Sequence, residues 1–149
     1  MDFDEANRIN QSIRGIVIRH RALADRLLGT LGLYAGQEVL LLELGEKGPR
    51  SQAQLAVASG CEPPTITHSV RKLEAAALVE RWPSPDDGRV TMVGLSDHGR
   101  EVLVQLKAVW CELADQTVAG LTGTSVELLD EVVADLGSSL ASALSERPA

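Results

Sequence analysis

The sequence predicts a mainly α-helical protein with a single small β-hairpin. Apolar residues make up 44% of the 149 residues but aromatic residues only 3%. The core must therefore consist of leucine, valine, alanine and isoleucine, which suits helices packed on helices better than a β-sandwich or barrel. Apolar positions recur at helical spacing in segments that glycine and proline separate. Asp87-Gly88 lies between two short β-compatible runs and favours a hairpin at that point.

Three helices are predicted in the first part of the chain. The first spans about residues 7–28 and carries one regular apolar stripe. The positions of the stripe are Ile9, Ile13, Ile16, His20, Leu23 and Leu27. The second helix spans about residues 36–46 and is closed by Gly48-Pro49. Ser51 and Gln54 form a capping box, which predicts a short third helix through Ala58.

A helix-turn-helix followed by a β-wing is predicted next. A fourth helix begins at Pro63-Pro64, where proline is tolerated in the first turn, and runs to about Ala77. β-Compatible runs follow over residues 78–82 and 90–95, with the Asp-Gly turn between them. Residues 51–78 therefore have the proportions of a helix-turn-helix, and the hairpin placed directly after them makes a wing.

Two further helices are predicted in the C-terminal part. Ser96 caps a long helix, and Thr124 with Glu127 forms a second capping box that opens the last one. The tail, residues 145–149, is expected to be disordered. The wing is thus flanked by helices on both sides along the chain.

Composition excludes several classes of protein. No segment approaches the roughly 20 uninterrupted apolar residues of a membrane span, and the acidic N-terminus lacks the order of a secretory signal. A cytoplasmic location is therefore expected. Cys61 and Cys111 match no metal-ligand spacing, so neither a metal nor a cofactor is predicted. The histidines are spread along the chain, without a nucleophile motif or phosphate loop, so we do not expect an enzyme.

The charge balance by itself argues against nucleic acid, because the formal net charge is −7. The excess acid is concentrated in residues 96–149, which carry three basic residues against nine acidic ones. A DNA-binding face needs only local positive charge, and remote acidic residues keep the protein soluble and limit non-specific binding. The charge weakens a DNA-binding interpretation without excluding it.

The fourth predicted helix carries polar side chains suited to reading DNA. The second helix of a helix-turn-helix enters the major groove, and its N-terminal half reaches base edges. That half here contains Thr65, Thr67, His68, Ser69, Arg71 and Lys72. On an isolated helix these residues would more simply form a solvated face. The adjoining wing favours the DNA-binding interpretation, because negative potential in the minor groove attracts arginine.

Several short segments, which follow one another in the same order as in the family, make the sequence resemble the MarR family of bacterial regulators. The segments are Gln54-Leu55-Ala56, Pro63 to Thr67, Arg71 to Arg81, Asp87-Gly88-Arg89, and Val93-x-Leu95-Ser96-x-x-Gly99. The similarity is close over residues 33–100. The resemblance implies a winged helix-turn-helix protein that binds double-stranded DNA as an intertwined α-helical homodimer. It also implies a small-molecule pocket between the dimerisation and DNA-binding parts.

The resemblance assigns roles along the chain. Residues 1–32 and 98–149 would dimerise, and residues 33–97 would bind DNA, all within one compact domain. The expected function is repression at an inverted-repeat operator, relieved by an effector such as an aromatic acid or phenol. The expected DNA contacts are Ser51, Thr65, Thr67, His68, Ser69, Arg71, Lys72, Arg81, Asp87, Gly88 and Arg89.

Four residues depart from the family pattern. Glu62 stands where a serine or threonine often caps the recognition helix, and His68 where arginine is frequent. Gly88 replaces the first arginine of a common Asp-Arg-Arg wing, and Ala77 replaces a usual glycine. Fewer charges at these points suggest weaker or more selective DNA binding. The alternative is a winged-helix protein-interaction module with weak or lost DNA binding.

Candidate effector residues lie on two of the predicted helices and near the start of a third. MarR-like proteins that sense aromatic acids place arginine and histidine on the first helix, where Arg14 and His20 stand here. Trp110 and Tyr34 would line the same cavity. The simpler interpretation places His20 in a dimer core and Arg14 on the surface.

A thiol-based redox sensor is a further alternative. It would use Cys61 or Cys111. We expect these residues to be inert, because a small buried side chain fits at Cys61 and buried cysteines rarely react.

Overall fold

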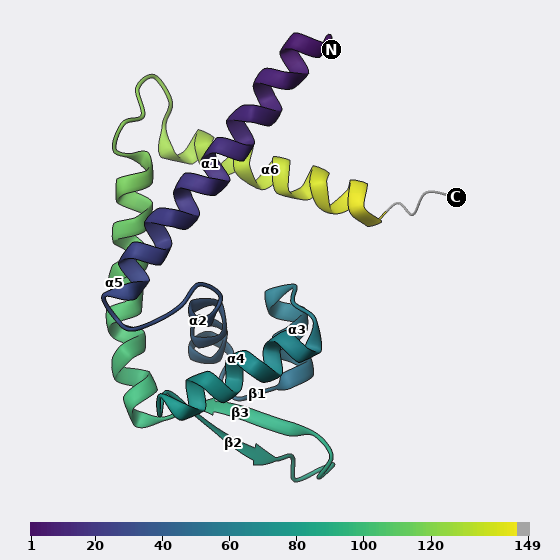
Figure 1. Cartoon of the computed structure of the whole chain (residues 1–149), viewed down its shortest axis with the longest axis vertical. Helices are drawn as coiled ribbons and strands as arrows, with labels where there is room; N and C mark the ends of the chain where they lie inside the picture. Colours follow the sequence, from purple (N-terminus) through teal and green to yellow (C-terminus); the bar gives the residue numbers. More distant parts are fainter. Residues whose placement is uncertain (146–149) are drawn as a thin grey trace. The chain divides into compact units, whose positions relative to one another are not determined.

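The computed structural model describes residues 1–145 and confirms a mainly helical fold with a small β-wing (Figure 1). The helices are α1 (Phe3–Gly29), α2 (Gln37–Lys47), α3 (Gln52–Ser59), α4 (Pro63–Ala75), α5 (Asp97–Val118) and α6 (Val126–Ser145). The strands are β1 (Arg50–Ser51), β2 (Val79–Pro83) and β3 (Thr91–Leu95). The chain forms two compact units, Met1–Leu113 and Ala114–Ala149, each of which is described by itself.

Local capping signals fix where several helices begin. Helix α1 starts earlier than its apolar stripe predicts, because the Asp2 carboxylate accepts a hydrogen bond of 2.9 Å from the Glu5 amide. The capping box of α3 is confirmed: the Ser51 hydroxyl accepts from the Gln54 amide at 3.1 Å, and the Gln54 side chain accepts from the Ser51 amide at 2.9 Å. The predicted start of α3 is therefore confirmed, whereas the predicted start of α1 was wrong by about four residues.

The wing belongs to a three-stranded antiparallel sheet in the order β1-β3-β2. Strands β2 and β3 pair from Val79 opposite Leu95 to Pro83 opposite Thr91. The connection between them is closed by the Ser84 amide, which donates to the Val90 carbonyl at 2.8 Å. Strand β1 was not predicted, because it has only two residues and its pairing with Met92 and Val93 is long-range.

The core of the first unit is almost entirely aliphatic, as composition predicts. Residues from α1, α2, α3, α4, α5 and the sheet meet in one buried cluster. Its most deeply buried members are Leu28, Leu40, Leu41, Leu55, Ile66, Val70, Leu73, Val93 and Leu106. This core holds the helix-turn-helix and the base of the wing together.

The predicted end of the fourth helix was wrong by two residues. Helix α4 ends at Ala75, and Ala77 has a φ of 57°, in the left-handed region. The chain turns there so that the Leu78 amide can donate to the Leu73 carbonyl at 2.9 Å and strand β2 can begin. The position that is usually glycine in the resembled family thus holds an alanine in a glycine-like conformation.

A tight joint connects the end of α4 to the start of α5. As predicted, Ser96 caps α5: its hydroxyl accepts from the Gly99 amide at 2.9 Å, and it also donates to the Ala77 carbonyl at 2.6 Å. The Ser96 amide donates to the Leu78 carbonyl at 3.1 Å. A Cβ at Gly99 would overlap that same carbonyl oxygen, so only glycine permits this approach.

The last helix also begins differently from the prediction. Thr124 was expected to cap it, but α6 starts at Val126 and the Ser125 hydroxyl accepts from the Leu128 amide at 3.2 Å. A hydrogen bond from the Glu127 backbone amide, and a second one with the Ser125 side chain, lower the pKa of the Glu127 carboxylate. Ser145 is helical, and the rest of the predicted disordered tail, residues 146–149, lies outside the described residues.

Two helices leave apolar side chains uncovered. The N-terminal half of the α1 stripe is open, with Ile9 43% and Ile16 63% exposed. No residue of α6 is buried. The large exposed apolar side chains on α6 are Val126, Leu128, Val132, Val133, Leu136, Leu140 and Leu144. Each of these faces has the apolar pattern of a packing surface but remains exposed within residues 1–145.

Candidate nucleic-acid interface

Helix α4 presents a polar face because its apolar face is held in the core. Ile66, Val70 and Leu73 are at most 2% exposed, and their spacing places them on one stripe. Fully burying each of these side chains contributes about 1.5–3 kcal/mol. Glu62, which precedes the helix, makes no side-chain capping hydrogen bond. The position of α4 therefore depends on its buried stripe rather than on a capped N-terminus.

Four of the predicted DNA contacts on α4 are exposed: Thr65, His68, Arg71 and Lys72. His68 lies three residues before Arg71 and four before Lys72, so the three share one side of the helix. Lys72 Nζ lies 5.6 Å from the centroid of the Tyr34 ring, a cation–π distance. Tyr34, a predicted effector residue, therefore lies beside a predicted DNA contact.

Thr67 and Ser69, also predicted as DNA contacts, are half-buried. The Thr67 hydroxyl donates toward the Gln52 side-chain oxygen at 3.2 Å and the Pro63 carbonyl at 3.1 Å, so it connects α4 to α3. Ser69 lies in the wall of a cavity behind the helix. Sequence patterns did not identify Gln52, because its contact with Thr67 crosses the turn between the two helices.

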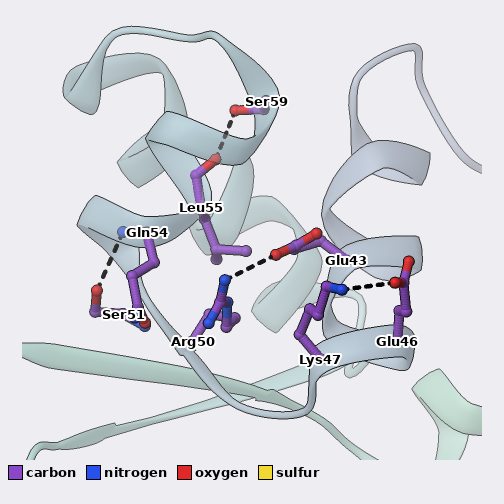
Figure 2. A network of polar contacts seen from close by, with 8 residues as sticks. All are labelled: Glu43, Glu46, Lys47, Arg50, Ser51, Gln54, Leu55 and Ser59. Atoms are coloured by element: carbon purple, nitrogen blue, oxygen red, sulfur yellow. Dashed lines mark hydrogen bonds and ion pairs between the residues drawn. The ribbon is translucent and has the colours of Figure 1, made fainter.

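Strand β1, which leads into the first helix of the helix-turn-helix, is joined to α2 by an ion pair (Figure 2). Arg50 Nη2 lies 3.2 Å from Glu43 Oε1, and the pair is mostly shielded from solvent. Arg50 Nε is buried without a hydrogen-bond partner among the described residues. The Ser59 hydroxyl donates to the Leu55 carbonyl at 2.7 Å near the far end of α3. Ser51 is the N-cap of α3 and also pairs with Met92 of β3.

The wing is connected to α4 by one ion pair. Arg81 on β2 donates to Glu74 Oε2 through Nη2 at 2.5 Å and through Nε at 2.8 Å. The guanidinium holds the pKa of Glu74 below its usual range, and the carboxylate raises the pKa of Arg81. Arg81, a predicted DNA contact, is therefore occupied in orienting the wing on the recognition helix.

The wing tip presents Arg89 to solvent. Its side chain is 96% exposed, and its Nε lies 4.0 Å from Asp87 Oδ1. The same carboxylate oxygen accepts the Arg89 backbone amide at 3.1 Å, which fixes the turn that contains Gly88. Because this side chain is almost fully exposed, its guanidinium can reach an external anion.

A cavity of about 420 Å³ lies behind the N-terminal half of α4. Two predicted effector residues, His20 on α1 and Trp110 on α5, line it. Arg14 and Tyr34 are not in its wall, and the arginine that lines it is Arg21. Thr65 and Ser69 of α4 are also in the wall, so the cavity and the recognition helix share side chains.

Both cysteines are exposed, which contradicts the expectation that Cys61 is buried. Cys61 follows the left-handed turn at Gly60, and this turn directs its side chain to the cavity wall rather than to the core. Within residues 1–145, no cluster of histidine, cysteine or acidic side chains is suited to a metal ion. None of the helices in that range has the length and apolarity needed to cross a membrane.

Sequence comparison identifies the family. The profile of the MarR family matches residues 33–91. The chain is 30% identical over 115 residues to the HTH-type transcriptional repressor IacR of Pseudomonas putida, and the alignment covers 77% of this chain and 69% of the relative. The segment matched by the family profile, residues 33–91, contains the whole helix-turn-helix and most of the wing.

Comparison with solved structures extends the similarity to most of the chain. A mutant of Escherichia coli MarR complexed with operator DNA superposes with a TM-score of 0.79 at 21% identity, over 91% of this chain and 99% of that one. Bordetella bronchiseptica BpsR, whose DNA binding is regulated by 6-hydroxynicotinic acid, gives a TM-score of 0.76 at 22% identity, over 89% and 98%. At these identities the structures show a shared fold. The family match and the 30% identical relative show that the chain belongs to the MarR family, whose members are transcriptional regulators and not enzymes.

Proposed function

We propose that the chain is a homodimeric repressor that occupies an inverted-repeat operator and is released by a small-molecule effector. The main support for this proposal is the geometry of α4. Its apolar residues Ile66, Val70 and Leu73 are buried. Its polar residues His68, Arg71 and Lys72 are exposed. Such a helix can enter a major groove while the wing brings Arg89 toward the neighbouring minor groove. The relative named as a repressor and the neighbour bound to operator DNA support this role.

The dimer is supported by the uncovered apolar faces of α1 and α6. Each face is long and regular, and neither is buried in the chain by itself. Two-fold pairing of such faces would cover them and present two copies of α4 about one helical turn of DNA, roughly 34 Å, apart. An operator with inverted half-sites follows from that symmetry.

The effector site is assigned to the cavity behind α4. Arg21 and His20 offer positive or hydrogen-bonding groups to an acid, and Trp110 offers an aromatic wall. A ligand there would touch Thr65 and Ser69 and could shift the recognition helix directly. The regulation of BpsR by a heteroaromatic acid supports an aromatic acid as the effector class.

A DNA-binding titration tests the proposal. DNA from the protein's own upstream region is titrated at two salt concentrations with the wild type, Arg71→Ala and Arg89→Ala. Loss of a groove contact at Arg71 should weaken binding by about 1–3 kcal/mol, and loss of Arg89 should flatten the salt slope by about one unit. Lys107→Ala is the control, because it removes one exposed positive charge from α5, outside the interface.

The competing function is a protein-interaction module without operator binding. It is favoured by the net charge of −7 and by Gly88 in place of a wing arginine. The interaction-module function would be excluded by salt-sensitive DNA binding that is weakened in Arg71→Ala and Arg89→Ala but not in Lys107→Ala. Absence of binding to upstream DNA, or equal loss in all three variants, would favour it over repression.

A further inference from the structure

Tyr34, in the loop between α1 and α2, presents an exposed aromatic ring on a fixed backbone. The residue is 71% exposed, so the ring contributes little to the core. The Tyr34 amide donates to the Gln37 side-chain oxygen at 2.9 Å, and the Gln37 amide donates to the Tyr34 carbonyl at 3.0 Å. Gln37 is the first residue of α2 and is itself buried. The backbone of Tyr34 is therefore held by the start of α2.

The Tyr34 ring holds the side chain of a lysine that makes no ion pair. Lys72 Nζ lies 5.6 Å from the ring centroid, which is a cation–π distance. Among residues 1–145 no carboxylate pairs with Lys72, whereas Arg81 is paired with Glu74. A lysine ammonium is a compact charge on a long flexible stem, so the ring contact restricts where that charge can lie.

The place of Lys72 in α4 favours a contact with the DNA backbone over a contact with a base. Lys72 lies in the last turn of α4, whereas the N-terminal part of a recognition helix reaches the bases. Lysine binds phosphate as a point charge, and phosphate contacts fix the register of a protein on the duplex. Ordering a long side chain at an interface costs free energy, and a ring that has already ordered it reduces that cost.

We infer that Tyr34 is a positioning residue of the DNA interface, which holds the Lys72 ammonium in place for a phosphate of the operator backbone. This inference rests on the proposed operator binding. It extends the interface from the helix-turn-helix and the wing to the loop between α1 and α2. The contact is made by the face of the ring, so the phenol hydroxyl is not required.

The test is a DNA-binding titration of Tyr34→Leu, Tyr34→Phe, Lys72→Ala and the double variant Tyr34→Leu/Lys72→Ala. The probe is DNA from the protein's own upstream region, and fluorescence anisotropy measures its affinity at several salt concentrations. Lys72→Ala should lower the salt slope by about one unit, because one phosphate contact is lost. Tyr34→Leu should weaken binding by about two- to fivefold, which is part of the cost of ordering one long side chain. Tyr34→Phe keeps the ring face and should bind as the wild type does.

The double variant distinguishes positioning of Lys72 from a general structural effect. If Tyr34 acts through Lys72, Tyr34→Leu should weaken binding no further in the Lys72→Ala background. Lys107→Ala is the matched control, because it removes another exposed lysine, on α5, and Tyr34→Leu should there weaken binding as much as it does alone. The inference is overturned by an equal loss in every background or by a loss in Tyr34→Phe as large as in Tyr34→Leu. It is also overturned if Tyr34→Leu binds more tightly, or if Lys72→Ala leaves the salt slope unchanged.

The outcomes separate this inference from the proposed function. If the wild type does not bind the upstream DNA, operator binding is wrong, and the inference is wrong with it. If the wild type binds and Arg71→Ala weakens binding while Tyr34→Leu does not, operator binding stands and only the role of Tyr34 is refuted. Because the Tyr34 ring is exposed, Tyr34→Leu should keep the wild-type free energy of unfolding, which urea unfolding measures.

Discussion

Ala77 holds a backbone conformation that alanine adopts at a cost. Its φ of 57° lies in the left-handed region, where a Cβ crowds the following carbonyl. Ala77→Gly should therefore raise the free energy of unfolding by up to about 1 kcal/mol, reduced by the greater flexibility of glycine in the unfolded chain. Urea unfolding measures this. Ala76 has a φ of −83°, so Ala76→Gly should bring no gain, and a gain there would contradict the explanation.

At the scale of elements, the wing and the recognition helix are joined through Glu74 and Arg81. Because the pKa of Glu74 is lowered in the folded state, the pair stabilises this contact above the usual glutamate pKa. The stabilisation is lost as the pH falls through the lowered folded-state pKa. We expect an acid transition in the fluorescence of Trp82, the neighbour of Arg81 on β2, in a Trp110→Phe background.

Glu74→Gln should remove that transition, because the side chain no longer titrates. Glu80→Gln is the control: Glu80 also neighbours Arg81 on β2 but makes no ion pair within the described residues. The same acid transition in Glu74→Gln would show that another group is responsible.

Sequence patterns located elements through local signals and missed couplings between elements. The capping box of Ser51, the cap at Ser96 and the Asp-Gly turn each involve residues only a few positions apart, and all were found. The Glu74–Arg81 pair, the Thr67–Gln52 bond and strand β1 join different elements, so no spacing rule reveals them. Cys61 was misplaced for a related reason, since its exposure depends on how the α3–α4 turn sits on the rest of the first unit.

The candidate site was predicted in part. Of the predicted DNA contacts, His68, Arg71 and the wing-tip Arg89 are exposed, whereas Arg81 is paired with Glu74. For the cavity, the sequence indicated His20 and Trp110 but not Arg21. The apolar stripe of α1 is largely exposed, so helical periodicity alone does not show that Arg21, next to His20, also faces the cavity.

At the scale of the whole molecule, the open apolar faces predict a dimer. Ile16→Glu on α1 or Leu136→Glu on α6 should convert the protein toward monomers, because a charge cannot be buried unpaired at an apolar interface. Sedimentation velocity measures the change, and operator affinity should fall with it. Val57→Glu, at an 84% exposed position on α3, should remain dimeric. A dimer that survives both charged substitutions would place the interface elsewhere.

The contacts at Ser96 and Gly99 fix the C-terminal end of α4 and leave its N-terminal end less constrained. Its C-terminal end cannot separate from α5, because the Ala77 and Leu78 carbonyls are bonded to Ser96 and Gly99 fits against the chain without a Cβ. Its N-terminal end has no side-chain cap and borders the cavity. A tilt of α4 would therefore pivot about the fixed end, and the largest displacement would fall on its N-terminal turn, which the proposed function places in the major groove.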